Sequence, residues 1–383
     1  MKNKSKKLIT QTAFALLLLH ISVALLAQPR LRISLLTCSP GQELSETFGH
    51  SALRVIDSNS VVDNVYNYGT FPFYEPGFYI KFIRGKLKYS VEAEPYYSFI
   101  SYYQLTNRGV TEQVLNLTTQ QKIDMQYALL DNIKEANKYY QYDFFLDNCT
   151  TRLRDIIEKY TQPKPVLPAV MPPSFTFRNA IHQYLHVNNK PWSKLGIDLL
   201  LGANTDAVMT TAQQQFLPDN LMFSIDKVKN VKMVATTAQL FVVQPTLNKS
   251  SIFTPLTLSI FICLVIMGIS LFNNAYCQRA TRIIDKILFM LMGILAVLLF
   301  LMWVATNHSM TKDNYNLLWA SPLYIGYSFF LHKKTRLAKK ISAFVFVYLL
   351  LLMGCWFFLP QALNIAFLPL VALLTYRSFV NCK

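Results

Sequence analysis

A cysteine and a histidine, Cys149 and His50, are the residues of this chain best suited to nucleophilic chemistry. Cys149 begins the amphipathic segment CTTRLRDIIEKY, directly after Asp147 and Asn148, which are both good helix N-cap residues. The unpaired N–H groups and the positive dipole end of a helix N-terminus lower the pKa of a thiol, and the thiolate is its reactive form. A backbone N–H at such a position can also stabilise a developing oxyanion.

His50, in the stretch FGHSALRV, is the candidate general base for this thiol. A base of this kind needs a partner that orients its ring. A two-residue turn at residues 58–59 places His50 opposite Asn67 on the following strand. A turn one residue longer brings Tyr68 to that place instead. The residues therefore predict a Cys–His pair with Asn67 as its third member.

Two ordinary explanations compete with a catalytic pair. A lone Cys is commonly a buried structural residue. Cys38 is the other Cys expected outside the membrane, and exported cysteines often pair, so a disulfide between Cys38 and Cys149 is a rival prediction. The two residues lie far apart in the chain, and spacing alone does not decide between these possibilities.

The elements that must position these residues belong to an exported domain. Residues 1–27 have a basic head, an apolar middle and small residues before Gln28, the pattern of a signal peptide cleaved after Ala27. A retained N-terminal anchor is the alternative. Residues 28–250 then read as mixed α and β structure. The stretch 195–221 is expected to be helical and packed, and no chemical role is assigned to residues 190–250. Strands are predicted at 31–38, 51–57 and 61–69, and helices at 118–140 and 149–160.

The rest of the chain, residues 251–383, is predicted to be a transmembrane domain. A membrane helix needs roughly 20 apolar residues, which makes the third and fifth of its apolar segments marginal. Basic residues gather between the first and second segments and between the third and fourth, so the positive-inside rule places residues 28–250 outside. The five segments are 252–272, 287–305, 317–331, 341–359 and 362–376.

The net charge of +16 does not point to nucleic acid. Much of the excess lies in the predicted signal peptide and in loops between membrane segments, where it sets orientation and says little about partners. His182 and His186 have the spacing of a zinc pair, but Gln183 stands where the metallopeptidase motif has Glu. We therefore expect no nucleic-acid partner and no metal site.

Four residues are candidates for substrate binding. Arg152, on the helix of Cys149, could hold a phosphate head group, although an ion pair with a neighbouring carboxylate is the commoner outcome. His308 lies in the outer loop between the second and third membrane segments and could line a lipid entrance. Asn148 and Tyr68 are the remaining two candidates.

Several stretches resemble one known family. LLTCSPGQELSETFGHSALRV, NVYNYGTFPF and YDFFLDNCTTRLRD are similar to the exported domain of the Bacteroides-type lipoprotein N-acyltransferases, and NLLWASPLY to their membrane part. The resemblance implies an α+β fold, a permuted NlpC/P60 (papain-like) periplasmic domain followed by a five-helix transmembrane domain. In that permuted order His precedes Cys, so it also implies Cys149 as nucleophile, His50 as base and a structural, unbridged Cys38. The family often has a second polar residue on the strand after the His; here that strand offers Asn67 and Tyr68.

The resemblance further implies the reaction. Cys149 would take an acyl chain from a phospholipid as a thioester and pass it to the α-amine of the N-terminal diacylglyceryl-cysteine of a lipoprotein, with His50 moving the protons. This chemistry requires no metal or nucleotide cofactor. The expected partners are the phospholipid donor, the diacylated lipoprotein acceptor and the membrane.

The expected location is the bacterial inner membrane, with the catalytic domain on the periplasmic side. Two alternatives to the acyltransferase remain at this stage. One is a membrane-anchored NlpC/P60-like thiol amidase or endopeptidase of cell-wall peptides. The other is a non-catalytic module that binds lipoproteins or lipids.

Overall fold

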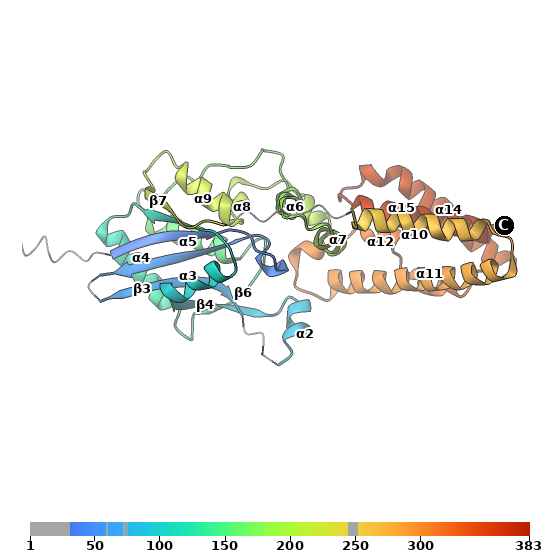
Figure 1. Cartoon of the computed structure of the whole chain (residues 1–383), viewed down its shortest axis with the longest axis horizontal. Helices are drawn as coiled ribbons and strands as arrows, with labels where there is room; N and C mark the ends of the chain where they lie inside the picture. The colour runs from blue at the N-terminus through green and yellow to red at the C-terminus, as the bar shows by residue number, and fades with distance from the viewer. Residues whose placement is uncertain (1–30, 59, 72–73, 75, 244–251) are drawn as a thin grey trace, which may run out of the picture.

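The structure is a computed structural model that describes residues 31–58, 60–71, 74, 76–243 and 252–383. The predicted signal peptide lies outside these residues. The described chain forms two parts along one long axis, an α+β domain followed by a group of long helices (Figure 1). This arrangement agrees with the predicted order of a mixed domain and a helical membrane region.

In the first part, seven described strands form one antiparallel sheet in the order β6-β4-β3-β2-β1-β5-β7. The strands predicted at 31–38, 51–57 and 61–69 are confirmed, each within one residue of its observed bounds. The bounds are β1 Leu31–Cys38, β2 His50–Asp57, β3 Val62–Thr70, β4 Lys88–Pro95, β5 Val110–Leu115, β6 Tyr139–Gln141 and β7 Val234–Phe241.

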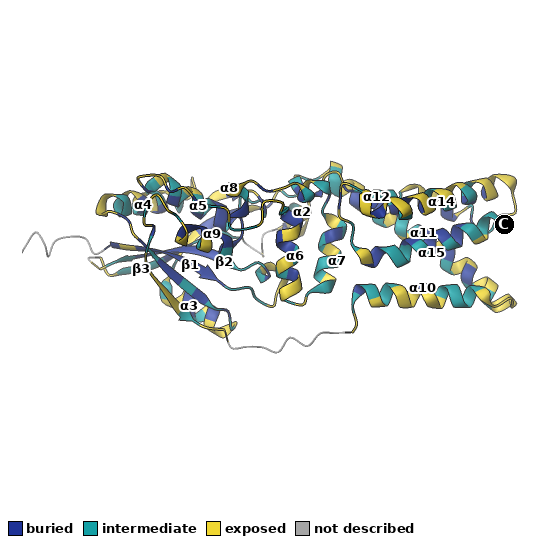
Figure 2. Cartoon of the chain, turned by 90° about the horizontal axis from the view of Figure 1, so that it is seen from above, coloured by how far each residue is buried: buried dark blue, intermediate teal, exposed yellow. Residues whose placement is uncertain are grey.

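Both faces of the central strands are covered by helices, which explains why β1 is an almost continuous apolar run. Leu35 and Leu53 pack into the cluster beneath α4 and α5, while Leu36 and Ala52 pack into the cluster beneath α3. Figure 2 shows β1 and β2 as the most buried strands. The helices are α3 Tyr96–Leu105, α4 Thr119–Asn132, α5 Cys149–Tyr160 and α9 Pro218–Asp226.

The helix predicted at 118–140 is too long. Thr118 caps α4, as its position suggested, but the helix ends at Asn132. The last residues of the predicted stretch form β6, which pairs with β4 at the sheet edge. Tertiary pairing therefore overrides the local helical pattern there.

The remaining helices of this part lie toward the helical region. α6 and α7 stand between the sheet and the long helices (Figure 2). The stretch 195–221, which was expected to be helical and packed, contains the end of α7 and all of α8, whereas residues 234–241 farther along form the strand β7. The bounds of these remaining helices are α2 Phe78–Ile83, α6 Phe177–Val187, α7 Pro191–Leu200 and α8 Thr211–Gln214.

The second part contains three described helical stretches that are long and apolar enough to cross a membrane. They are Ala275–Val304, Arg336–Phe358 and Ile365–Cys382, and they contain α11 (Ala275–Val304), α14 (Arg336–Cys355) and α15 (Leu368–Cys382). The first predicted segment becomes α10, Pro255–Leu271, a shorter apolar helix of 17 residues.

The third predicted segment, 317–331, is not one helix. It is divided into α12 (Asn316–Trp319) and α13 (Leu323–Ser328), which flank Pro322. Proline disfavours helical backbone in the residue before it and lacks an N–H for helical bonding, which accounts for the break. The expected count of five membrane helices is therefore not confirmed in the described residues, where this segment forms two short helices and α10 is shorter than a candidate span.

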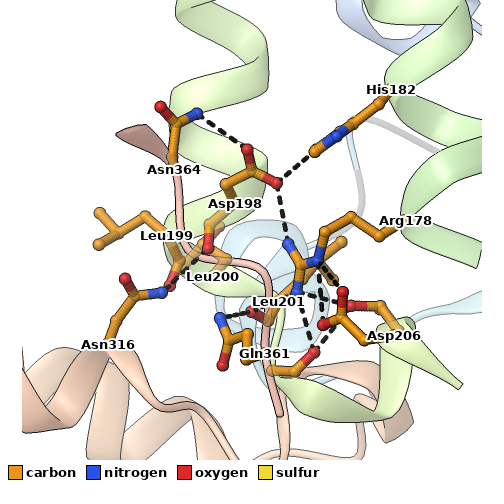
Figure 3. Close-up of polar contacts among 12 residues, drawn as sticks. Arg178, His182, Asp198, Leu199, Leu200, Leu201, Asp206, Asn316, Gln361 and Asn364 are labelled. Carbon is orange, nitrogen blue, oxygen red and sulfur yellow. Dashed lines mark hydrogen bonds and ion pairs between the residues drawn. The ribbon is translucent and has the colours of Figure 1, made fainter. Parts of the chain in front are cut away.

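A buried polar network joins the two parts (Figure 3). Arg178 on α6 forms ion pairs with Asp198 on α7, at 2.8 Å, and with Asp206, at 2.9 Å. The other oxygen of Asp198 accepts a 2.8 Å hydrogen bond from Asn364 in the helical region. Burial alone raises the pKa of Asp198, but the hydrogen bond from His182 and the charge of Arg178 outweigh it and lower that pKa.

The end of α7 completes this junction. The last carbonyls of a helix have no partner within it. Here amide side chains of the helical region supply the donors: Asn316 Nδ2 lies 3.0 Å from the carbonyl oxygen of Asp198, and Gln361 Nε2 lies 2.8 Å from that of Leu201 (Figure 3). The α+β domain is thus oriented on the helical region by hydrogen bonds that the carbonyl groups at the end of α7 require.

We expect Asp198→Ala to destabilise the protein by about 3 kcal/mol, because it leaves the buried Arg178 guanidinium with one carboxylate fewer. The measurement is denaturant unfolding of the full chain in detergent. Asp226→Ala is the control, since Asp226 is exposed and its loss should change stability by about 0.5 kcal/mol or less. Equal stability of the two variants would show that the network does not hold the junction.

Candidate active site

Cys149 is the first residue of α5, as predicted. Asn148 is the N-cap: its Oδ1 accepts hydrogen bonds from the backbone N–H groups of Thr150, at 2.8 Å, and Thr151, at 2.9 Å. As the first helical residue, Cys149 cannot donate its own N–H to a carbonyl within the helix. That N–H is therefore in position to stabilise an oxyanion formed beside the Sγ atom.

His50 begins β2, and its Nε2 is hydrogen-bonded to Asn67 Oδ1 on β3. The predicted contact exists, but the predicted turn is wrong. β2 ends at Asp57 and β3 begins at Val62, and the two residues are paired, so the loop is longer than two residues. Continuing this register places Gly69 opposite His50, and the Asn67 side chain reaches the imidazole diagonally.

Glu94 on β4 determines which way the Asn67 amide faces. Asn67 Nδ2 donates to Glu94 Oε1 at 3.1 Å, and a carboxylate oxygen can only accept. Asn67 Oδ1 must then face the imidazole, so His50 Nε2 is the donor in that bond. In the neutral ring this arrangement leaves the lone pair on Nδ1, the nitrogen that remains for the thiol.

The backbone before His50 also has a specific requirement. Gly49 has φ of +77°, a conformation that favours glycine, and a Cβ at this position would lie 2.6 Å from the carbonyl oxygen of Cys38. A side chain at residue 49 would therefore displace the start of β2. The Gly of the FGH motif is needed to place the base.

The electrostatics of the pair favour its charged form. Burial alone disfavours the thiolate, but the charge of His50, its hydrogen bond, the N–H of Ser51 and the hydroxyl of Thr150 together lower the pKa of Cys149 to about 7. Burial alone lowers the pKa of His50, but the thiolate charge and the hydrogen bonds to Cys149 and Asn67 outweigh it and raise that pKa. The geometry therefore supports a thiolate–imidazolium pair near neutral pH.

An apolar cavity of about 850 Å³ lies between the two parts of the molecule. Its walls come from α2, α7 and the last turns of α11, together with Phe48 and Phe144, which are close in sequence to His50 and Asn148. We call it the junction cavity. Its apolar lining includes Phe82, Ile83, Ile197, Leu200, Leu298 and Leu301.

A second cavity, of about 170 Å³, adjoins the junction cavity. It shares Phe144 with the junction cavity and reaches Tyr142. The ring of Tyr142 and the Cβ of Cys149 both lie 3.9 Å from the place where Gly69 would carry a Cβ. Tyr142, which lines the second cavity, therefore lies close to Cys149, although neither Cys149 nor His50 lines either cavity.

The structure places the predicted substrate-binding residues in different surroundings. His308 lines both cavities, and its Nε2 donates to the carbonyl oxygen of Phe82 at 3.0 Å. Arg152 forms a two-bond ion pair with Asp147, each bond at 2.7 Å, and stacks 3.6 Å above the Tyr140 ring. The commoner outcome foreseen for Arg152, an ion pair with a neighbour, is the one observed.

Asn148 and Tyr68 are engaged inside the protein, and the expectation that they bind substrate needs correction. Asn148 is 3% exposed, and its Nδ2 donates to the carbonyl oxygens of Phe144 and Phe216 in addition to the cap made by Oδ1. Tyr68 is 1% exposed, and its hydroxyl accepts a 2.6 Å bond from Asn132. Both side chains have their polar atoms satisfied by the fold.

Cys38 and Cys149 both have free thiols in the described structure. Cys38 is buried on β1, opposite His50 in the strand pairing. Burial raises the pKa of this thiol to about 12, which keeps it protonated and unreactive. The rival prediction of a bridge between the two cysteines is therefore wrong.

Comparison with known families matches both parts of the chain. Residues 24–183 match the model described as the Lnb N-terminal periplasmic domain, and residues 247–383 match the one described as the Lnb transmembrane domain. No curated protein and no solved structure matches the chain. The two matches bear out the resemblance noted in the sequence and support a membrane protein with a periplasmic portion.

The lowered pKa of Cys149 predicts its alkylation profile. Because only the thiolate reacts, the rate of iodoacetamide addition at Cys149 should reach half of its plateau near pH 7. His50→Ala removes the charge that favours the thiolate, so the midpoint should move up to about 8.5 or higher. Peptide mass spectrometry separates Cys149 from the other cysteines, and an unchanged midpoint in His50→Ala would contradict the pairing.

Glu94 is predicted to act through Asn67. Glu94→Gln can present either an oxygen or an NH₂ group, so the Asn67 amide is free to turn over and the tautomer of His50 is no longer fixed. We expect the alkylation midpoint of Cys149 to rise, with the rate at pH 7 falling about tenfold, which corresponds to about 1.4 kcal/mol.

Glu92→Gln is the matched control, because Glu92 is an exposed carboxylate on the same strand. Its profile should coincide with that of the unmodified protein. If Glu94→Gln behaves in the same way as Glu92→Gln, the orientation of the amide does not depend on Glu94.

Proposed function

Since the chain belongs to the Lnb family, we propose that it is a lipoprotein N-acyltransferase that works through a thioester on Cys149. The observation that carries this proposal is that Tyr142, which lines the smaller cavity, lies close to Cys149, while the adjoining junction cavity is apolar and reaches the end of α11. A thiol pair alone fits many acyl-transfer reactions. The apolar cavity selects a substrate with a hydrocarbon chain.

In the first half-reaction, the Sγ thiolate of Cys149 attacks the carbonyl carbon of a phospholipid acyl ester. The backbone N–H of Cys149 stabilises the oxyanion. As the ester C–O bond breaks, the His50 imidazolium gives its proton from Nδ1 to the leaving oxygen of the lysophospholipid. The acyl group is then held as a thioester, and His50 is neutral with its proton on Nε2.

In the second half-reaction, the neutral α-amine of the N-terminal diacylglyceryl-cysteine attacks the thioester carbonyl. His50 accepts a proton from that nitrogen at Nδ1, and the carbon–sulfur bond breaks to release the Cys149 thiolate. The product is an amide, and the thiolate–imidazolium pair is restored. Dividing one acyl transfer into two steps lets a single base serve both.

The alternative functions have less support. A peptidase of cell-wall peptides needs polar groups to bind its substrate, whereas the lining of the junction cavity is dominated by apolar side chains. A non-catalytic module with a structural disulfide does not fit the two free thiols of Cys38 and Cys149. The acyltransferase uses both the paired thiol and the apolar space.

The proposal predicts that the N-terminal peptide of a lipoprotein loses its amide-linked acyl chain when Cys149 or His50 is replaced by Ala. The measurement is mass spectrometry of that peptide from cells that carry the gene deletion, Cys149→Ala, His50→Ala or the unmodified gene. Cys355→Ala is the control, because it removes an exposed thiol from the helical region and should leave acylation intact.

A persistent amide-linked chain in both active-site variants would contradict the proposed reaction. Release of wall peptides that depends on Cys149 and His50, with acylation unaltered, would favour the amidase alternative instead.

A further inference from the structure

α2 is a short helix with an unusually exposed apolar surface. Phe78 is its buried residue, whereas Tyr79 is 76% exposed, Ile80 65%, Phe82 49% and Ile83 55%. Large apolar side chains gathered in this way normally mark a surface that is covered in use. The helix belongs to the connection between β3 and β4 and projects from the α+β domain (Figure 1).

The position of α2 is fixed against the end of α11. The carbonyl oxygen of Arg84 accepts a 2.9 Å hydrogen bond from the backbone N–H of Asn307, and that of Phe82 accepts one from His308. At Gly85, with φ of +63°, a Cβ would lie 3.1 Å from the backbone nitrogen of His308, so the two segments are in close contact.

This end of α11 lies at a membrane boundary. The basic residues of α11 are confined to its first turns, and the apolar sequence from Ile287 continues to the last residue, Val304. That stretch is about 27 Å long at 1.5 Å per residue, close to the hydrocarbon thickness of a bilayer. Trp303, one residue from the end, is typical of the interface. α2 therefore lies at the depth of the lipid head groups.

The charges of residues 77–88 also fit the lipid head-group region. Residues 77–88, GFYIKFIRGKLK, contain four cationic side chains and no acidic one. Arg84, Lys86 and Lys88 are exposed. Long basic side chains can reach phosphate groups while neighbouring apolar side chains enter the hydrocarbon boundary. The charge and the exposed apolar surface together fit the phospholipid leaflet.

We propose that α2 is an interfacial helix that inserts Tyr79 and Ile80 into the periplasmic leaflet and holds lipid phosphates with Arg84 and Lys86. Since Phe82 and Ile83 of the same helix line the junction cavity, the cavity then opens among the acyl chains of that leaflet. The insertion of α2 depends on the membrane position of α11 and does not depend on the proposed acyl transfer.

Photolabelling of the full chain in lipid nanodiscs tests this inference. The nanodiscs contain phosphatidylcholine and phosphatidylglycerol with a trace of a phosphatidylcholine that has a diazirine in the upper acyl chain. After irradiation and digestion, mass spectrometry should find lipid adducts on residues 77–84 and on the end of α11. The segment of α4 that contains Tyr127 and Leu130 is the control, since these residues are 68% and 42% exposed and lie in the α+β domain.

Two double variants make the test specific. Tyr79→Asp with Ile80→Asp should remove most adducts from residues 77–84, while Tyr127→Asp with Leu130→Asp should leave them unchanged. Alkylation of Cys149 by a water-soluble reagent should be equal in both, which shows that the domain is folded. A labelled end of α11 beside an unlabelled α2 would overturn the proposal and indicate that a protein covers this surface.

Discussion

The contact between Cys149 and His50 brings together two groups whose charged forms are opposed by burial, and the geometry of the proposed active site follows from that constraint. Each ion alone would be driven to its neutral form by desolvation. The charge of His50, the Ser51 N–H and the Thr150 hydroxyl oppose this effect and lower the pKa of Cys149 to about 7. These groups belong to the start of β2 and the start of α5, so the chemistry depends on bringing one strand end and one helix end together.

The second constraint is the satisfaction of buried backbone groups at the junction. A helix end packed against another part of the protein leaves carbonyls that water cannot reach. α7 solves this problem with amides from the helical region, and Asp198 adds an ionic contact to Arg178. α7 lies in the segment 184–246, between the two regions that match family models. Asp198 and the carbonyls of α7 therefore belong to neither region, whereas their partners Arg178, Asn316 and Gln361 lie within the matched regions.

The sequence predicted the helix and strands that carry the site residues better than it predicted which side chains of those elements meet. The cap at Asn148 and the strand at His50 depend on local residue types, and both were predictable. The partner of Asn67 was not, because Glu94 reaches it from a third strand whose alignment with β3 depends on a bulge near Gly69. Tyr68 and Asn148 are polar residues next to functional ones, and only their burial shows that the fold uses them. The break at Pro322 was visible in the sequence, but the apolar composition of the segment suggested a continuous helix.

The junction between α7 and the helical region determines the distance between Cys149 and the membrane helices. The hydrogen bonds and ion pair at this junction hold the α+β domain, and with it Cys149, at one position relative to the membrane helices in this structure. In the proposed reaction, the ester group of the lipid has to move from the bilayer to Cys149. The hydrocarbon tail of the lipid would remain in the junction cavity beside α11 during that movement. In the proposed reaction, the distance between the end of α11 and Cys149 is then the distance that an acyl ester must cover to reach the thiolate.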